Sequence, residues 1–180
     1  MILIAGIGNI FYGDDAFGVE VVRRMLLRPL PEGIRAVDFG IRGFDLACAL
    51  LEGYDAAILV DATARGGRPG TLYVIEPDLE SLAAGEQEMG IEGHSLSPAR
   101  VLQWVQALGG RMPHLRIVGC EPATLGDDDD PRMELSPQVA EAVEGALQMI
   151  QSLIEEFSIQ HTFRFPVPSP VEAVGIHTTR

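Results

Sequence analysis

The sequence contains little cysteine, little positive charge and no long apolar run. Its two cysteines, Cys48 and Cys120, lie far apart, and the first residues lack the charged segment and cleavage site of a secretory signal. Small secreted domains typically have disulfide-paired cysteines. Because this chain has only two distant cysteines and its first residues show no secretory signal, we expect a cytoplasmic protein. The longest apolar runs, such as residues 56–60, end well short of the roughly 20 residues that cross a bilayer, so we expect no membrane association.

The chain has 13 Lys+Arg residues against 26 Asp+Glu residues, which gives a formal net charge of -13. A negatively charged surface repels phosphate backbones and anionic lipids unless basic residues gather in one patch, and the sequence has no such patch. We therefore expect no nucleic-acid partner. A protein or a cation is the more natural partner for this chain.

The composition is that of a folded domain, because 47% of the 180 residues are hydrophobic and 22% are charged. A chain of this length buries a core without disulfides or structural metals. Apolar residues recur with helical spacing up to Phe157, whereas the segment beyond it contains several prolines and no periodicity. We predict a single domain over residues 1–157 and a mobile, Pro-rich tail over residues 158–180.

Apolar stretches alternate with amphipathic segments in the first third of the chain. Residues 2–7, 34–38 and 56–61 have the composition of short strands, whereas residues 16–27 and 44–51 have the spacing of helices. This β-α-β-α-β alternation is typical of a doubly wound, mostly parallel twisted sheet in an α/β fold.

The second half of the chain continues the pattern with one exception. Residues 71–75 follow a loop too short for a crossover helix, so we predict an antiparallel strand at an edge of the sheet. Ser-Pro pairs at 97–98 and 136–137 each place a capping residue before a proline, which predicts two helix starts. Residues 116–120 between these helices form a further strand.

Acidic residues occur at or just after the ends of the first three predicted strands. Asp15 lies in the loop after the first strand, and Asp38 and Asp61 end the second and third. Ligands of open parallel sheets bind outside the carboxyl ends of the strands, where the strand order reverses. With the first strand central, Asp15 and Asp61 face each other there, and a later loop can bring His94 to the same rim. Two carboxylates and one imidazole suit a divalent first-row metal.

Each of these residues also has an ordinary structural interpretation. An acidic residue at a helix start, such as Asp15, favours the helix dipole, and Asp61 can cap a turn at the strand end. A lone loop histidine such as His94 is more often not a ligand. Asp14 either caps the following helix or supports a ligand, and the cap is slightly favoured. Residues 127–130 are four consecutive aspartates, which are more typical of a solvated loop than of a cation site.

Seven short motifs occur along the chain in a characteristic order and spacing. In sequence order they are Gly6-Ile7-Gly8-Asn9, Gly13-Asp14-Asp15-Ala16-Phe17-Gly18, Asp38-Phe39-Gly40, Val60-Asp61-Ala62, Gly70-Thr71, Gly93-His94 and Gly119-Cys120-Glu121-Pro122. Over roughly residues 1–155 this set resembles the hydrogenase maturation proteases. These endopeptidases remove the C-terminal extension of the nickel-iron hydrogenase large-subunit precursor after nickel insertion.

The resemblance implies a three-layer α/β/α sandwich and a peptidase activity. It also implies that Asp15, Asp61 and His94 bind nickel. That nickel belongs to the substrate, the immature large subunit, and is not a resident cofactor of the protease. The partner implied is therefore the nickel-iron hydrogenase large-subunit precursor.

The turn after the second strand is the candidate for cleavage and substrate binding. We take Asp38 as the candidate catalytic residue and Gly40 and Gly43 as candidate substrate-binding residues. The turn reads Phe39-Gly40-Ile41 where the family has a Gly-Gly-Thr-like sequence, and Asp15 stands where some relatives have glutamate. The first difference bears on substrate selection, and the second shortens a ligand side chain by one methylene.

Two other functions remain open, and the first of them uses the same three ligands. A non-enzymatic nickel-binding chaperone inspects the large subunit without cutting it, and a small-molecule hydrolase keeps its own resident metal. A resident-metal enzyme retains stoichiometric metal on purification, whereas the protease is isolated largely metal-free. Only the protease changes the mass of a precursor.

Overall fold

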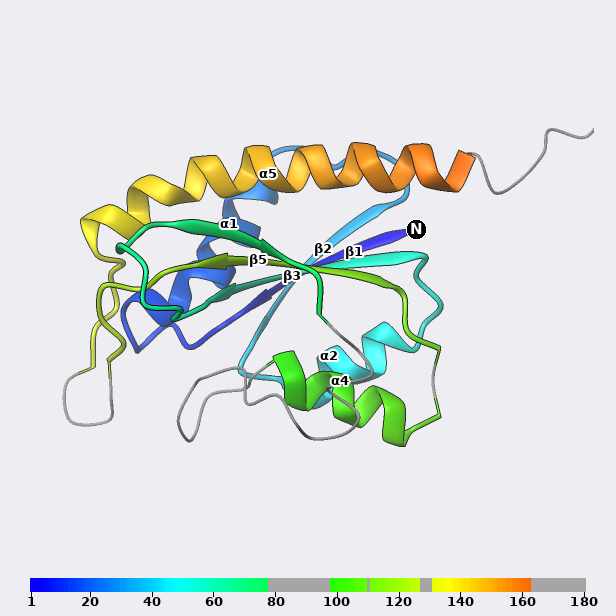
Figure 1. The fold of residues 1–180 in the computed structure, drawn as a ribbon, viewed down its shortest axis with the longest axis horizontal. Helices are drawn as coiled ribbons and strands as arrows, with labels where there is room; N and C mark the ends of the chain where they lie inside the picture. Colours follow the sequence, from blue (N-terminus) through cyan, green and yellow to red (C-terminus); the bar gives the residue numbers. More distant parts are fainter. Residues whose placement is uncertain (78–97, 110, 127–130, 163–180) are drawn as a thin grey trace, which may run out of the picture.

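The computed structural model describes residues 1–77, 98–109, 111–126 and 131–162, and a five-stranded sheet lies at its centre (Figure 1). The strands are β1 (Ile2–Ile7), β2 (Ile34–Gly40), β3 (Ala56–Ala62), β4 (Leu72–Ile75) and β5 (His114–Cys120). Their order in the sheet is β2-β1-β3-β5-β4. All neighbours are parallel except β4, which runs antiparallel to β5 at one edge. The predicted mostly parallel sheet with an antiparallel edge strand is confirmed.

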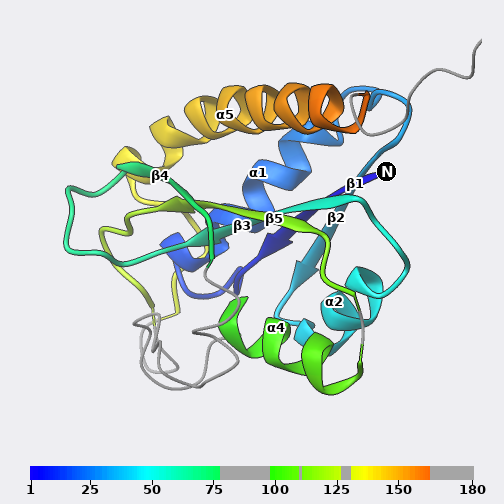
Figure 2. The same ribbon diagram turned by 45° about the vertical axis from the view of Figure 1, so that its right-hand side comes forward.

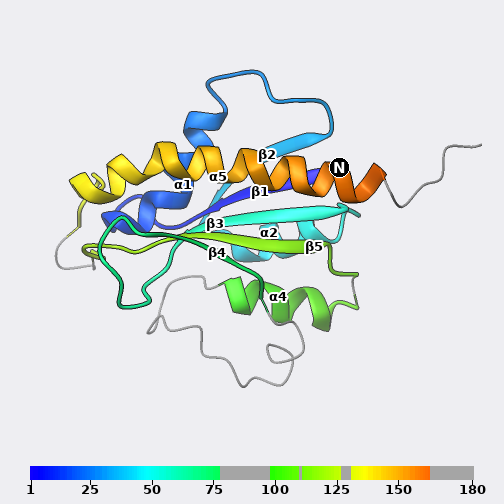
Figure 3. The same ribbon diagram turned by 45° about the horizontal axis from the view of Figure 1, so that its top comes forward.

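Helices cover both faces of the sheet, which makes three layers (Figures 2 and 3). One face carries α1 (Phe17–Met25) and α5 (Pro137–Thr162), and the other carries α2 (Gly43–Leu50) and α4 (Pro98–Ala107). A short 3-10 turn, η1 (Asp14–Ala16), precedes α1. Both predicted Ser-Pro helix starts agree with helices that begin at the proline. None of the helices described is long and apolar enough to span a membrane.

The inner strands are apolar at every position because both of their faces are buried. Ile2 and Ile4 of β1 pack in the core beneath α1 and α5, whereas Leu3, Ala5 and Ile7 pack in the core beneath α2 and α4. Strand β3 is likewise buried throughout. A continuous apolar run is what a parallel strand with helices on both sides requires.

Helix α1 lies almost directly on the sheet because two glycines permit it. A Cβ added to Gly18 would lie 2.0 Å from the carbonyl oxygen of Val60, and one added to Gly6 would lie 2.4 Å from the carbonyl oxygen of Gly18. Any side chain at either position would push the helix away from β1 and β3. This close packing brings η1, at the start of the helix, against the carboxyl end of β3.

Two element ends differ from the prediction. Strand β2 continues past Asp38 to Gly40, because Gly6 of β1 pairs with Asp38 while the next residue, Ile7, pairs with Gly40. Phe39 is the extra residue of this irregularity, and its side chain is buried in the core beneath α2 and α4. Asp38 therefore lies inside the strand and does not end it.

Helix α5 extends beyond the predicted domain boundary. Among the residues whose burial the structure describes, Phe157 is the last buried apolar one and agrees with the boundary at residue 157, but the helix continues to Thr162. Residues after an apolar stripe can remain helical without adding to the core, so the stripe locates the end of the packing and not the end of the helix. The rest of the predicted mobile tail, residues 163–180, lies outside the described residues.

Candidate active site

The strand order reverses at β1, since the chain passes from β1 to β2 on one side and then returns to β3 on the other. Asp15 lies in η1, just after β1, and Asp61 is the penultimate residue of β3. The structure therefore brings Asp15 and Asp61 together at the switch point, as the strand-end rule predicted. Both residues are buried, with 7% and 3% of their surface exposed.

Burial and mutual repulsion make this pair of carboxylates unusually basic. The pKa of Asp61 is raised well above its ordinary value of 3.8, first by burial and then by the negative charge of Asp15, while the N–H of Ala62 partly opposes this. Burial also raises the pKa of Asp15, against a hydrogen bond of 2.6 Å from the N–H of Asn9 to Oδ2. Within the described ranges, neither forms an ion pair with arginine. Such a pair favours binding of a proton or a cation.

Asp14 is also buried, but its carboxylate is saturated in the sense that both of its oxygens already accept hydrogen bonds. Its Oδ2 accepts the N–H groups of Ala123 at 2.8 Å and Thr124 at 3.0 Å, and its Oδ1 accepts the N–H of Ser136 at 2.6 Å. The residue before η1 is Gly13, and no side chain caps the turn. The interpretation of Asp14 as a helix cap is therefore wrong.

Glu121, which follows β5, is a second saturated carboxylate. It accepts the N–H groups of Arg65 at 2.8 Å and Gly66 at 3.1 Å and the hydroxyl of Tyr73 at 2.8 Å. Burial raises the pKa of Glu121, but these hydrogen bonds outweigh it, so the pKa is lowered overall. Glu121 fixes the loop between β3 and β4. Support of a ligand was one of the two alternatives that the sequence offered for Asp14, whereas nothing apart from a family motif pointed to Glu121.

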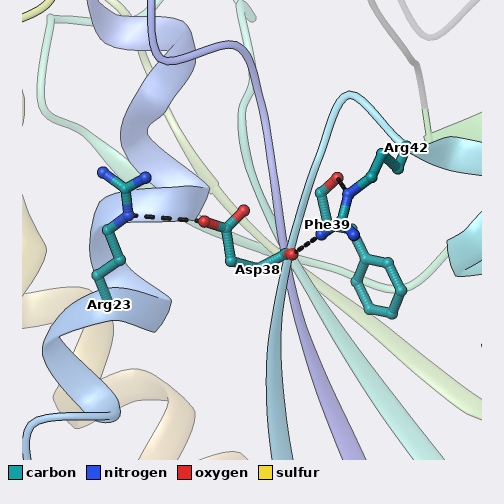
Figure 4. Close-up of polar contacts among 4 residues, drawn as sticks. All are labelled: Arg23, Asp38, Phe39 and Arg42. Carbon is teal, nitrogen blue, oxygen red and sulfur yellow. Dashed lines mark hydrogen bonds and ion pairs between the residues drawn. The ribbon is translucent and has the colours of Figure 1, made fainter.

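Asp38 lies on β2, which is next to β1 but is separated by β1 from Asp61 on β3, and its surroundings are partly cationic (Figure 4). Its Oδ2 is 3.5 Å from Nε of Arg23 on α1, and the side chain is 33% exposed. Arg42 donates hydrogen bonds to the carbonyl oxygens of Asp38 and Phe39, and the Nε bond to Phe39 is 3.1 Å long. Arg23 thus orients the carboxylate toward α1, while Arg42 holds the turn that follows β2.

Of the other predicted site residues, two lie at the turn after β2 and one lies outside the described residues. Gly40 ends β2, and its carbonyl oxygen accepts the N–H of Gly8 at 3.0 Å, so the turn touches the loop that leads to Asp15. Gly43 is the buried first residue of α2. His94 lies outside the described residues, as do residues 127–130. In the part of the chain that the structure describes, no group of three or more His, Cys, Asp or Glu side chains could hold a metal ion.

Fold and site together define a doubly wound α/β protein with a buried carboxylate pair at its switch point. The family model for hydrogenase maturation proteases, HycI, matches residues 19–153. The chain therefore belongs to the hydrogenase maturation protease family, and it is a peptidase. This confirms the resemblance that the sequence motifs indicated.

Individual relatives agree with this assignment. The hydrogenase expression/formation protein HupD of Bradyrhizobium diazoefficiens is 30% identical over 159 residues, which cover 88% of this chain and 80% of HupD. The hydrogenase 2 maturation protease of Escherichia coli is 28% identical over 162 residues, 88% of this chain and 93% of that protein. The solved structure of the E. coli hydrogenase maturating endopeptidase HybD superposes with a TM-score of 0.67 at 28% identity, covering 86% of this chain and 92% of HybD.

Proposed function

We propose that this endopeptidase removes the C-terminal extension of a nickel-iron hydrogenase large-subunit precursor after nickel insertion, and that Asp15, Asp61 and His94 recognise the substrate's nickel. The observation that carries the proposal is the pair Asp15 and Asp61, two buried carboxylates whose pKa values are raised. A divalent cation relieves both the burial of charge and the mutual repulsion.

The donor set fits a metal that arrives with the substrate. Two carboxylates and one imidazole supply three ligands, so further positions remain for other donors. Cysteine thiolates are better donors for nickel than carboxylates, and a substrate that supplies them completes the coordination sphere. Nickel is therefore part of the substrate in this proposal, and the protease alone holds it only weakly.

The turn after β2 is where we place peptide cleavage and substrate binding. Hydrolysis needs a water activated by a general base or by the metal. Asp38 is our candidate catalytic residue because its carboxylate is partly exposed, unlike the saturated carboxylates of Asp14 and Glu121. Gly40 and Gly43 bracket the turn that Arg42 holds, and we assign them to the substrate backbone.

We place this activity in the cytoplasm. Cys48 and Cys120 are both free thiols, and Cys120 is buried. Unpaired cysteines are the usual state in a reducing compartment.

The proposal is tested by mass spectrometry of a large-subunit precursor incubated with the protein, with and without nickel. Loss of a C-terminal peptide only from the nickel-loaded precursor is the expected result. Cleavage of both forms overturns nickel recognition, and cleavage of neither favours a chaperone. Asp55→Asn is the matched control, because Asp55 is a partly exposed aspartate at the opposite end of β3 that pairs with the N-terminus.

A further inference from the structure

Asp14 connects the turn that carries Asp15 to a distant part of the chain. Its carboxylate is fully buried, and its three N–H donors lie 109, 110 and 122 positions later in the sequence. All three donors belong to the connection between β5 and α5. Three N–H groups on one carboxylate stabilise its negative charge, and they fix its position relative to both ends of this connection.

Backbone hydrogen bonds also join the residues around Asp14 to the β5–α5 connection. The N–H of Gly13 donates to Arg132 at 2.6 Å, and the N–H of Asp14 donates to Thr124 at 3.3 Å. The N–H of Gly126 donates to Tyr12 at 3.0 Å. The segment before η1 is thus held between two segments of the β5–α5 connection, and the Asp14 side chain supplies the hydrogen bonds closest to Asp15.

The opposite side of Asp15 is held by the loop after β1. A Cβ added to Gly8 would lie 1.7 Å from the carbonyl oxygen of Asp15, so the two backbones are in direct contact. The N–H of Asn9 binds Oδ2 of Asp15. No N–H or O–H of the described residues donates to its Oδ1, so Asp15, unlike its neighbour, retains acceptor capacity for a cation.

We infer that Asp14 is a positioning residue, which sets the place of Asp15 relative to Asp61 by fixing η1 to the β5–α5 connection. This inference rests on the function proposed above. Consecutive residues of a 3-10 turn point about 120° apart. Asp14 can therefore accept hydrogen bonds from the β5–α5 connection while Asp15 binds the metal. A shift of the turn moves Asp15 and leaves Asp61 in place on its strand.

The isosteric substitution Asp14→Asn separates this role from that of a ligand. An amide offers one acceptor oxygen and turns N–H donors toward other N–H donors, so at least one of the three hydrogen bonds is lost. Loss of an outer partner of a metal ligand lowers metal affinity or activity about 10- to 100-fold. We expect a loss of this size in the nickel affinity of the isolated protein and in kcat/KM on nickel-loaded precursor, because the same carboxylates bind free nickel and the nickel of the substrate. Asp14→Glu keeps the charge and should recover part of the loss.

The matched control is Glu121→Gln, since Glu121 is also a buried carboxylate saturated by N–H groups but is not adjacent to Asp15. The three variants and wild type are compared by thermal melting, by calorimetric titration with Ni²⁺ and by precursor cleavage, below all melting temperatures. Glu121→Gln should lower the melting temperature yet keep kcat within about threefold.

Wild-type values for Asp14→Asn, or equal losses in Asp14→Asn and Glu121→Gln, overturn the positioning role. If wild type itself neither binds Ni²⁺ nor cleaves the precursor, the proposed function fails and the inference fails with it. The two failures are therefore distinguishable by the behaviour of wild type.

Discussion

The negative charge of Asp15 raises the pKa of Asp61, although the two residues come from different elements on either side of the switch point. The fold creates this repulsion, because α1 packs directly on β1 and β3 and so brings η1 to the end of β3. Two like charges in a buried position oppose folding unless a proton or a cation is bound.

Replacing either carboxylate of the pair should abolish processing without unfolding the protein. We expect Asp15→Ala, Asp61→Ala and His94→Ala each to lower precursor cleavage by more than about 100-fold, since each removes a proposed ligand. Asp15→Glu keeps the charge and should cost less. Cleavage is followed by mass spectrometry and folding by circular dichroism, with Asp55→Asn as the control. Normal processing by any of these alanine variants removes that residue from the site.

Asp61→Asn should stabilise the protein at neutral pH while it abolishes activity. The pKa of Asp61 is raised in the folded state. The contribution of its bound proton to the free energy of unfolding is therefore fully present below the unfolded pKa of 3.8 and is lost as the pH rises through the folded pKa. The amide avoids that loss. For each ~1 kcal/mol gained, the melting temperature should rise by about 2–4 °C.

The comparison is made by thermal melts of wild type and Asp61→Asn over a series of pH values. The difference between them should be largest near neutral pH, should shrink as the pH falls through the raised folded pKa, and should be smallest below pH 3.8. An Asp61→Asn variant that melts below wild type at neutral pH contradicts the prediction.

Glu121→Gln should have the opposite pH dependence. The pKa of Glu121 is lowered in the folded state, so its contribution to stability is present above the unfolded value of 4.5 and is lost as the pH falls through the folded pKa. We expect the variant to melt at least about 4 °C below wild type at neutral pH. The gap should narrow in acid, and a gap that is constant from pH 7 to pH 3 argues against the charged hydrogen-bonded carboxylate as its cause.

The strand-end rule located the buried pair from sequence because it depends only on element order. Continuous apolar runs identified β1 and β3 as inner strands, and the carboxyl ends of such strands lie at one rim. Asp15 and Asp61 could thus be placed together before any side chain was positioned. The edge strand β4 was predicted for a similar reason, since loop length alone excluded a crossover.

The hydrogen-bond partners of Asp14 could not be predicted in this way, so its support of a ligand remained one of two alternatives. Its three hydrogen-bond donors lie in an irregular connection more than a hundred residues away, and irregular segments carry no periodicity that would place them. The end of β2 was missed because Phe39 is an extra residue in the pairing with β1, and composition does not reveal a register shift. Both misses concern backbone geometry rather than residue chemistry.

Removing the residues after Thr162 should leave stability nearly unchanged, because that segment has no periodic apolar face. The melting temperature should stay within about 2 °C of wild type. The matched control is a truncation before Leu153, which also removes Ile154 and Phe157 from the core. That control should melt far lower, and an equally large fall for the shorter truncation would show that the tail packs on the domain.

A site with three protein ligands, two of them carboxylates, should bind free Ni²⁺ weakly, because thiolates that are better donors must come from a partner. Binding by the isolated protein should weaken further as the pH falls, since the raised pKa values of Asp15 and Asp61 let protons compete with the metal at a higher pH than ordinary carboxylates allow. Protonation of His94 acts in the same direction. Nickel-loaded precursor should bind much more tightly than nickel-free precursor in a calorimetric titration, and equal affinity for the two forms excludes recognition through the metal.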